Sequence, residues 1–215
     1  LFPLNDTIHK HLEELFTSLE NILASESSLC YDYEYDRIIC FGELISTTII
    51  SDYLKMKGIE NQFIDIRKFL KTDQNYRNAN IDLELSEQLC KDAFDFNTSS
   101  VFVTQGFIAG TRTNQTTTLG REGSDYTAAL LANLLNAEDV TIWKDVPGVM
   151  NADPKEYEKA QVISRMSYKE AIELSHFGAK VIHPKTIKPI QNKQIPLYVR
   201  SFLHPESEGT VIQEI

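Results

Sequence analysis

Short apolar runs and helical patterns alternate along most of this chain, and that alternation limits the fold more than any other feature. Apolar runs that end at turn residues are typical of buried strands, and the segments between them place apolar residues at helical spacing. This alternation predicts an α/β fold, with parallel strands covered by helices. The predicted strands are 37–41, 62–66, 100–104, 140–143, 197–200 and 210–212, and the predicted helices are 7–23, 44–54, 81–94, 124–135, 168–177 and 184–192.

The segment around residue 40 carries the first strand, turn and helix of this pattern. We interpret the acidic stretch 32–36 as a solvated loop and the apolar run 37–41 as a strand. Gly42 and Glu43 then form a tight turn into the helix 44–54. No low-complexity linker or internal repeat divides the 215 residues, so we expect one continuous domain.

Charge and cysteine content exclude several classes of protein. With 31 acidic and 21 basic residues the chain has a net charge of −10, which argues against a dedicated nucleic-acid binder. The first 99 residues hold 18 of the acids and 9 of the bases, so a site for an anion is expected in the second half. Three cysteines without metal-ligand spacing indicate neither a disulfide framework nor a zinc site, and they fit a reducing cytosol. No apolar run is long enough to predict a membrane helix or a membrane partner.

Five of the nine glycines lie between residues 106 and 148, which indicates that the backbone there approaches something closely. The segment 119–125, Leu-Gly-Arg-Glu-Gly-Ser-Asp, leads into the helix predicted from 124, with Ser124 or Asp125 as its N-cap. Free backbone N–H groups and the helix dipole would make this segment an anion site, while an ordinary capped loop explains the glycines equally well. The spacing matches neither the dinucleotide-binding pattern nor the P-loop.

The stretch 116–129, Thr-Thr-Thr-Leu-Gly-Arg-Glu-Gly-Ser-Asp-Tyr-Thr-Ala-Ala, closely resembles the signature of the aspartokinases in the amino-acid kinase superfamily. Other motifs match in the same order on both sides of it, so the resemblance extends from about residue 37 to the C-terminus. They are Phe-Gly-Glu at 41–43, Gln-Gly-Phe at 105–107, Trp-Lys-Asp-Val-Pro-Gly-Val at 143–149, Ala-Asp-Pro at 152–154 and Phe-Gly-Ala-Lys-Val-Ile-His-Pro at 177–184.

The resemblance implies a fold and an activity. The fold is the three-layer α/β/α sandwich of the amino-acid kinases, with a mostly parallel sheet and the active site at the carboxyl ends of its strands. The activity is transfer of a phosphoryl group from ATP, with Mg²⁺ carried on the ATP phosphates, to the side-chain carboxylate of L-aspartate. The product, 4-phospho-L-aspartate, enters lysine, threonine and methionine biosynthesis in the cytoplasm. A carboxylate is already ionised at pH 7, so this chemistry needs no general base.

Two sets of site residues follow from the matching positions. An aspartate-binding lobe of about residues 1–123 and a nucleotide-binding lobe of about 124–215 are implied. Arg121 would bind the substrate carboxylate with its planar guanidinium. Glu43 would bind the ammonium or, in the alternative, only cap a helix, and Asp125 would orient a catalytic lysine. The aspartate pocket comprises Glu43, Phe107, Arg121, Ser124 and Asp125, and the nucleotide site comprises Lys144, Asp145, Met150, Lys155 and Lys180, with no direct metal ligand expected.

Several positions depart from the family pattern. Lys144 stands where a small hydroxyl residue is usual, Met150 where an aromatic residue is common and Lys155 where arginine is usual. Glu122 replaces a small residue beside Arg121. Asn114 stands where glycine is frequent, a mild change because asparagine tolerates the left-handed conformation.

The family's first strand, which reads roughly Lys-Phe-Gly-Gly-Thr-Ser, and its C-terminal ACT-type regulatory domains have no match in this chain. We therefore expect a truncated kinase domain with little or no turnover alone, whose parent is a homo-oligomer assembled through those regulatory domains. Two other functions stay open: a related kinase that acts on glutamate or acetylglutamate, and a non-catalytic module that only binds its ligands.

Overall fold

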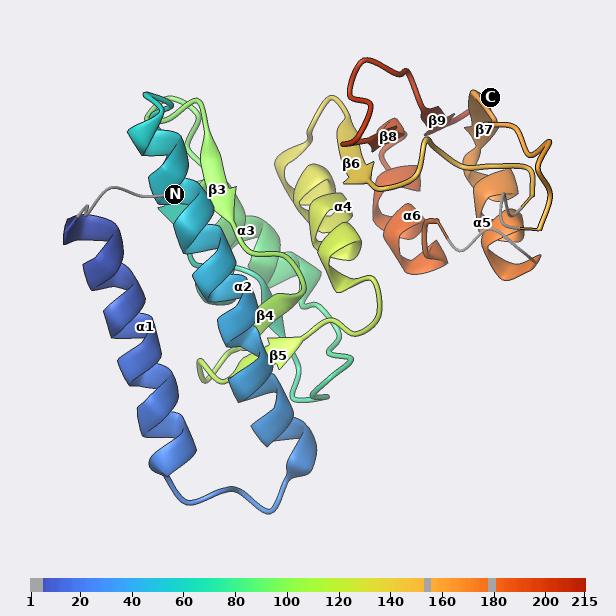
Figure 1. Ribbon diagram of the computed structural model, residues 1–215. Helices are drawn as coiled ribbons and strands as arrows, with labels where there is room; N and C mark the ends of the chain where they lie inside the picture. The colour runs from blue at the N-terminus through green and yellow to red at the C-terminus, as the bar shows by residue number, and fades with distance from the viewer. Residues whose placement is uncertain (1–5, 153–155, 178–180) are drawn as a thin grey trace. The chain divides into compact units, whose positions relative to one another are not determined.

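The computed structural model describes residues 6–152, 156–177 and 181–215, and the chain divides into two compact units between Gly123 and Ser124. Of the six strand pairs among these residues, four are parallel and two antiparallel. Helices and strands alternate along the chain (Figure 1). The prediction of an α/β fold with mostly parallel strands is therefore confirmed. Within these residues, no helix combines the length and the apolar character needed to cross a membrane.

The first unit begins with two helices that lie side by side, α1 (Asp6–Ala24) and α2 (Tyr31–Met56) (Figure 1). Strands β1 (Gln62–Ile64) and β3 (Phe102–Thr104) form a parallel pair that contacts α2. The remaining elements of this unit are a short 3-10 helix at Ile66–Lys68, β2 (Lys71–Thr72), α3 (Leu83–Ala93), β4 (Ile108–Thr111) and β5 (Thr116–Thr118).

The α2 helix contradicts the prediction for residues 32–43. The acidic stretch 32–36, the run 37–41 and the turn at 42–43 are all parts of one continuous helix. The reason is visible in its buried residues, which recur every three or four positions as a helix face requires. They are Asp36, Cys40, Phe41, Leu44, Thr47 and Ser51. Ile38 and Ile39, which made the run look like a strand, are 37% and 42% exposed.

A buried lysine holds the β4–β5 hairpin, which the sequence analysis did not predict. Lys71 on β2 donates from Nζ to the backbone oxygens of Arg67 and Thr111, at 3.1 and 3.3 Å, and to Oδ1 of Asn114 at 3.1 Å. Burial lowers the pKa of Lys71. Asn114 has φ 63°, so it adopts the left-handed conformation that the sequence analysis considered tolerable there.

The second unit is built on a four-stranded sheet in the order β6-β8-β9-β7. Strands β6 and β8 pair in parallel, β7 and β9 pair in parallel, and β8 and β9 are antiparallel. A buried cluster that includes Ala129, Ile187, Leu197 and Ile212 joins the helices to this sheet. The elements are α4 (Gly123–Leu135), β6 (Val140–Lys144), β7 (Arg165–Ser167), α5 (Tyr168–Phe177), α6 (Pro184–Gln191), β8 (Leu197–Ser201) and β9 (Thr210–Gln213).

Alanine substitutions at two glycines test the backbone conformation of the first unit. Gly42→Ala should raise the free energy of unfolding by up to about 1 kcal/mol, because alanine favours a helix interior and no atom lies within 4 Å of the added Cβ. Gly110→Ala should lower it by about 1–3 kcal/mol, since its Cβ would overlap the backbone carbonyl of Arg67. Urea unfolding measures both. A clear loss of stability in Gly42→Ala would contradict the continuous helix.

Candidate active site

Glu43 lies in the interior of α2 rather than at the predicted strand-to-helix turn. It is partly buried, and this burial raises the pKa of its carboxyl group. Its backbone oxygen accepts a hydrogen bond from Oγ1 of Thr47 at 2.6 Å. Because Glu43 directly precedes the buried Leu44 and lies one helical turn before the buried Thr47, the helix alone fixes where its side chain starts.

Gln105 connects this part of α2 to the motif that contains Phe107. Its side chain is 1% exposed, and Nε2 donates to Oγ1 of Thr47 at 3.1 Å. Its Oε1 accepts from the backbone N–H of Ile66 at 3.0 Å. A buried amide that is satisfied on both sides fixes the chain that carries it, so the segment leading to Phe107 is anchored to the helix that carries Glu43.

Phe107 contacts the glycine-rich segment 119–123. Its φ is 68°, an uncommon conformation for an aromatic residue, and its backbone oxygen accepts from the N–H of Leu119 at 2.8 Å. A Cβ placed on Gly123 would lie 2.7 Å from the Phe107 ring. The glycine at position 123 is therefore needed because the aromatic ring packs directly on its backbone. The structure thus packs Phe107 against the loop that carries Arg121.

Asp36 is a residue that the sequence analysis misread as part of a solvated loop. It is fully buried on α2, and its Oδ2 accepts from the backbone N–H groups of Thr118 and Arg77, each at 2.8 Å. Its Oδ1 accepts from Oγ1 of Thr118 at 2.8 Å. The backbone of Ala79 also donates to the oxygen of Thr118, at 2.9 Å. This carboxylate therefore fastens the start of the loop that carries Arg121.

The loop itself leaves Arg121 exposed, and the guanidinium makes no ion pair or hydrogen bond with any residue that the structure describes. Gly120 has φ 78°, and a Cβ there would lie 2.8 Å from Oδ1 of Asn78. Helix α4 then begins at Gly123. Ser124 and Asp125 consequently lie in its first turn, and neither is the N-cap that the sequence analysis predicted.

In the second unit, Lys144 and Asp125 form an ion pair. The Nζ of Lys144, the last residue of β6, is 2.8 Å from Oδ2 of Asp125, and the two side chains are 19% and 14% exposed. Asp145 follows the strand and is exposed, and Met150 is partly buried and forms an isolated antiparallel bridge with Val162. The other two residues expected at the nucleotide site, Lys155 and Lys180, lie outside the described residues.

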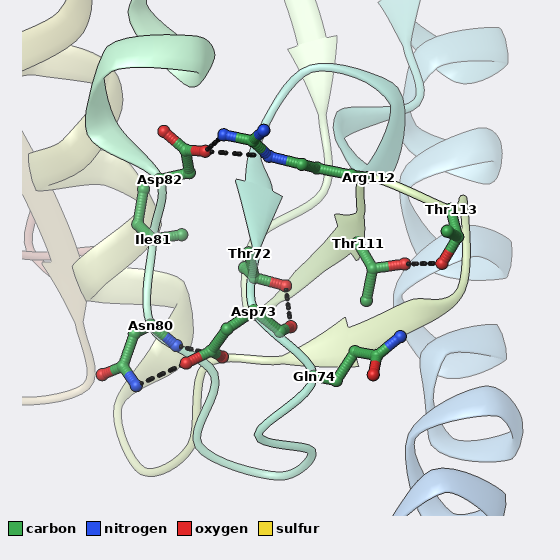
Figure 2. Close-up of a pocket in the computed structure, with 9 residues that line it drawn as sticks. All are labelled: Thr72, Asp73, Gln74, Asn80, Ile81, Asp82, Thr111, Arg112 and Thr113. Atoms are coloured by element: carbon green, nitrogen blue, oxygen red, sulfur yellow. Dashed lines mark hydrogen bonds and ion pairs between the residues drawn. The ribbon is translucent and has the colours of Figure 1, made fainter.

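A separate hollow in the first unit contains none of these residues. Figure 2 shows this cavity of about 430 Å³, in which Arg112 pairs with Asp82 and Asp73 bonds to Asn80. Arg112 and Asp82 are thus paired with each other, and the carboxylate of Asp73 is hydrogen-bonded to an amide. Among the described residues, no group of three or more His, Cys, Asp or Glu side chains is arranged to hold a metal ion.

Comparison with known proteins now identifies the family. The sequence model of the amino acid kinase family matches residues 6–201. This chain belongs to the amino acid kinase family. It is 38% identical over 204 residues to the lysine-sensitive aspartokinase 3 of Escherichia coli, a match that covers 93% of this chain and 45% of the relative. It is 36% identical over 213 residues to a bifunctional aspartokinase/homoserine dehydrogenase of Buchnera aphidicola, covering 96% of this chain and 26% of that protein.

Solved structures agree with the amino acid kinase assignment. The crystal structure of E. coli aspartokinase III in complex with aspartate and ADP superimposes with a TM-score of 0.89 and 34% identity, and the match covers 96% of this chain and 46% of that one. The amino-acid kinase fold expected from the sequence is therefore confirmed. The chain spans less than half of the length of these relatives.

Asp36 and Asp32 form a matched pair for a stability test, since both lie on α2 and both contact Arg77. Asp36→Asn should lower the free energy of unfolding by about 2–3 kcal/mol, because an amide cannot accept from all three donors and one is left buried without a partner. Asp32→Asn, which removes only the exposed pair with the Arg77 guanidinium, should have little effect. Guanidinium unfolding of both variants measures this, and equal losses would contradict the anchoring role of Asp36.

Proposed function

We propose that this amino acid kinase uses ATP to phosphorylate the side-chain carboxylate of L-aspartate, giving 4-phospho-L-aspartate, the first intermediate on the way to lysine, threonine and methionine. The observation that carries the proposal is the match over 96% of the chain to a structure whose own ligands are aspartate and ADP. The contact of Phe107 with the loop of Arg121 supports it, since both are expected in the aspartate pocket.

The residues of the first unit suit an amino acid with two carboxylates. Arg121 presents an exposed guanidinium that can bind a carboxylate with two parallel hydrogen bonds. Glu43 supplies a carboxylate for the substrate ammonium. Ser124, which belongs to the second unit, carries an exposed hydroxyl in the first turn of α4, where the helix dipole favours a negative charge.

Phosphoryl transfer to a carboxylate depends on how the two substrates are positioned and needs no proton transfer. The nucleophile is an ionised carboxylate oxygen, so this chain has no proton to remove. One O–P bond forms to the aspartate oxygen, and the bond between the γ-phosphorus and the bridging oxygen of ATP breaks, with its electron pair leaving on ADP. The residues lower the barrier by holding two anions close together and by neutralising the charge on the transferred group.

The nucleotide site is proposed in the second unit, around Lys144, Asp145 and Met150, with Lys155 and Lys180 as further members. Mg²⁺ is proposed to be held by the ATP phosphates, because it keeps several of its waters and needs few protein ligands. We further propose a cytoplasmic protein that forms homo-oligomers through regulatory domains in its full length.

An assay of ADP release with ATP, Mg²⁺ and L-aspartate tests the activity in the full-length protein. Arg121→Ala should lower kcat/KM for aspartate by about 10- to 100-fold, the loss expected for a charge-assisted hydrogen-bonded pair. Arg112→Ala is the control, because Arg112 is an exposed arginine of the same unit that pairs with Asp82 outside the site. Turnover with L-glutamate or N-acetyl-L-glutamate but not L-aspartate would contradict the proposed substrate.

Glu43→Gln should separate substrate binding from stability. Burial raises the pKa of Glu43, so ionising it costs the folded state free energy, and this cost appears as pH rises from the ordinary value of 4.5 through the raised pKa. The variant should therefore be at least as stable as the wild type at pH 7, and its relative stability should increase between pH 4 and pH 7. Its KM for aspartate should rise about tenfold, since the ammonium loses a charged partner.

Thermal unfolding at the two pH values and steady-state kinetics measure these effects. Glu13→Gln, an exposed change on α1, is the matched control and should alter neither quantity. An unchanged KM in Glu43→Gln would remove Glu43 from the aspartate pocket.

A further inference from the structure

Phe107 lies at the centre of a strained turn. Its φ is 68°, and the N–H of Ile108 donates to the backbone oxygen of Gly106 at 2.7 Å across it. A hydrogen bond that spans three residues, with a positive φ at the middle one, is the mark of the rarer and more strained kind of γ-turn. Such a conformation persists only where the surrounding structure holds it, so the segments on both sides of Phe107 have to be fixed.

The contacts on the two sides of this γ-turn differ. After it, β4 pairs with β5, and the N–H of Leu119 donates to the backbone oxygen of Phe107 at 2.8 Å. Before it, β3 ends at Thr104, and Gly106 has no side chain with which to bond. Gln105 is therefore the residue nearest the turn on its entry side whose side chain can hold the turn in place.

A chain of hydrogen bonds runs from Gln105 to Glu43, and its direction is fixed. The backbone N–H of Ile66 can only donate, so the group that it meets at 3.0 Å is the oxygen Oε1 of Gln105. The amide nitrogen Nε2 then faces Thr47 and donates to its Oγ1 at 3.1 Å. That hydroxyl in turn donates to the backbone oxygen of Glu43 at 2.6 Å. Gln105 and Thr47 are both buried, so the loss of one bond leaves a buried polar group without a partner.

Helix α2 is held on both sides of Glu43. On its N-terminal side, Asp36 bonds to Thr118 at the start of the glycine-rich loop. On its C-terminal side, Thr47 bonds to Gln105 at the entry to the γ-turn. Both contacts lie within the first unit. The carboxylate expected to bind the substrate ammonium therefore starts from a backbone whose place is fixed relative to the loop and to the turn.

We propose that Gln105, acting through Thr47, is a positioning residue that sets the distance between Glu43 and Phe107, and that it thereby makes the pocket select the length of its substrate. This inference rests on the proposed function and deepens it. L-Glutamate differs from L-aspartate by one methylene, a difference worth about 10- to 200-fold in a pocket of fixed shape. A pocket whose Phe107 turn can relax adapts to the longer amino acid and loses part of this discrimination.

The test removes the hydroxyl of Thr47 in the full-length protein. Thr47→Val keeps the shape of the side chain and leaves Nε2 of Gln105 without an acceptor. The Kd for L-aspartate should rise about tenfold, the effect of one unpaired buried group, while the Kd for L-glutamate stays nearly unchanged. The preference for aspartate therefore falls by the same factor. The KM for ATP should not change, because the nucleotide site is proposed in the second unit. Calorimetry with both amino acids and steady-state kinetics measure these effects.

Two further variants separate positioning from stability. Thr47→Ser keeps the hydroxyl and should keep the wild-type Kd for aspartate. Ser51→Ala is the matched control, because Ser51 is also a buried hydroxyl on α2 bonded to a buried amide, with Oγ 2.6 Å from Oδ1 of Asn61. It should lower the midpoint of urea unfolding to a similar degree as Thr47→Val, and it should leave both Kd values unchanged.

Should Thr47→Val not fold, Gln105→Asn replaces it. The shorter side chain cannot span the distance from Ile66 to Thr47, so this variant should show the same selective rise in the Kd for aspartate. Equal weakening of aspartate and glutamate binding, unchanged Kd values, or the same selective change in Ser51→Ala would overturn the positioning role of Gln105. A wild-type protein that binds aspartate but releases no ADP would instead overturn the proposed function. The ratio of the two Kd values needs no turnover, so the two failures are distinguishable.

Discussion

The buried carboxylate of Asp36 is the interaction on which the geometry of the first unit depends. A charge with no exposed surface is tolerated only when strong donors surround it, and the three that do so come from Thr118 and Arg77. These donors lie more than 40 residues from Asp36 in the sequence, one in the turn after β2 and two at the end of β5. One carboxylate on α2 thus fixes both the start of the loop that carries Arg121 and the segment against which Gly120 packs.

The second constraint is the close contact between the backbone of the loop that carries Arg121 and the residues around it. Gly120 lies against Asn78 and Gly123 lies against the ring of Phe107, so neither position has room for a side chain. Phe107 itself adopts a positive φ, which is a strained conformation that surrounding contacts must hold in place. The hydrogen bond from Leu119 and the buried amide of Gln105 provide that support on its two sides. This close packing explains why positions 120 and 123 of the sequence are glycines.

The sequence predicted the elements whose patterns are long and periodic, and it failed where the pattern was short or the contacts were distant. Helices 81–94 and 168–177 were found with little error, because each places apolar residues at regular helical spacing. The run 37–41 was misassigned, since four consecutive apolar residues do not distinguish a strand from a helix. Strand β2 has only two residues and leaves no pattern at all. Among the site residues, the contact of Phe107 with Gly123 and the pairing of Lys144 with Asp125 both depend on tertiary packing, which leaves no local pattern in the sequence.

Charges held away from water occur at the candidate site as well as at the structural contacts of Asp36 and Lys71. The pair of Lys91 and Glu87 on α3 is about half exposed on both sides and is of the kind that contributes little. By contrast, Glu43 is partly buried with a raised pKa, and Lys144 and Asp125 are mostly buried at a strand end. Titratable groups in such costly environments tend to occur where a protein binds charged ligands. A chain with a net charge of −10 repels anions at long range, so any anion that it binds needs a cation held at a fixed point.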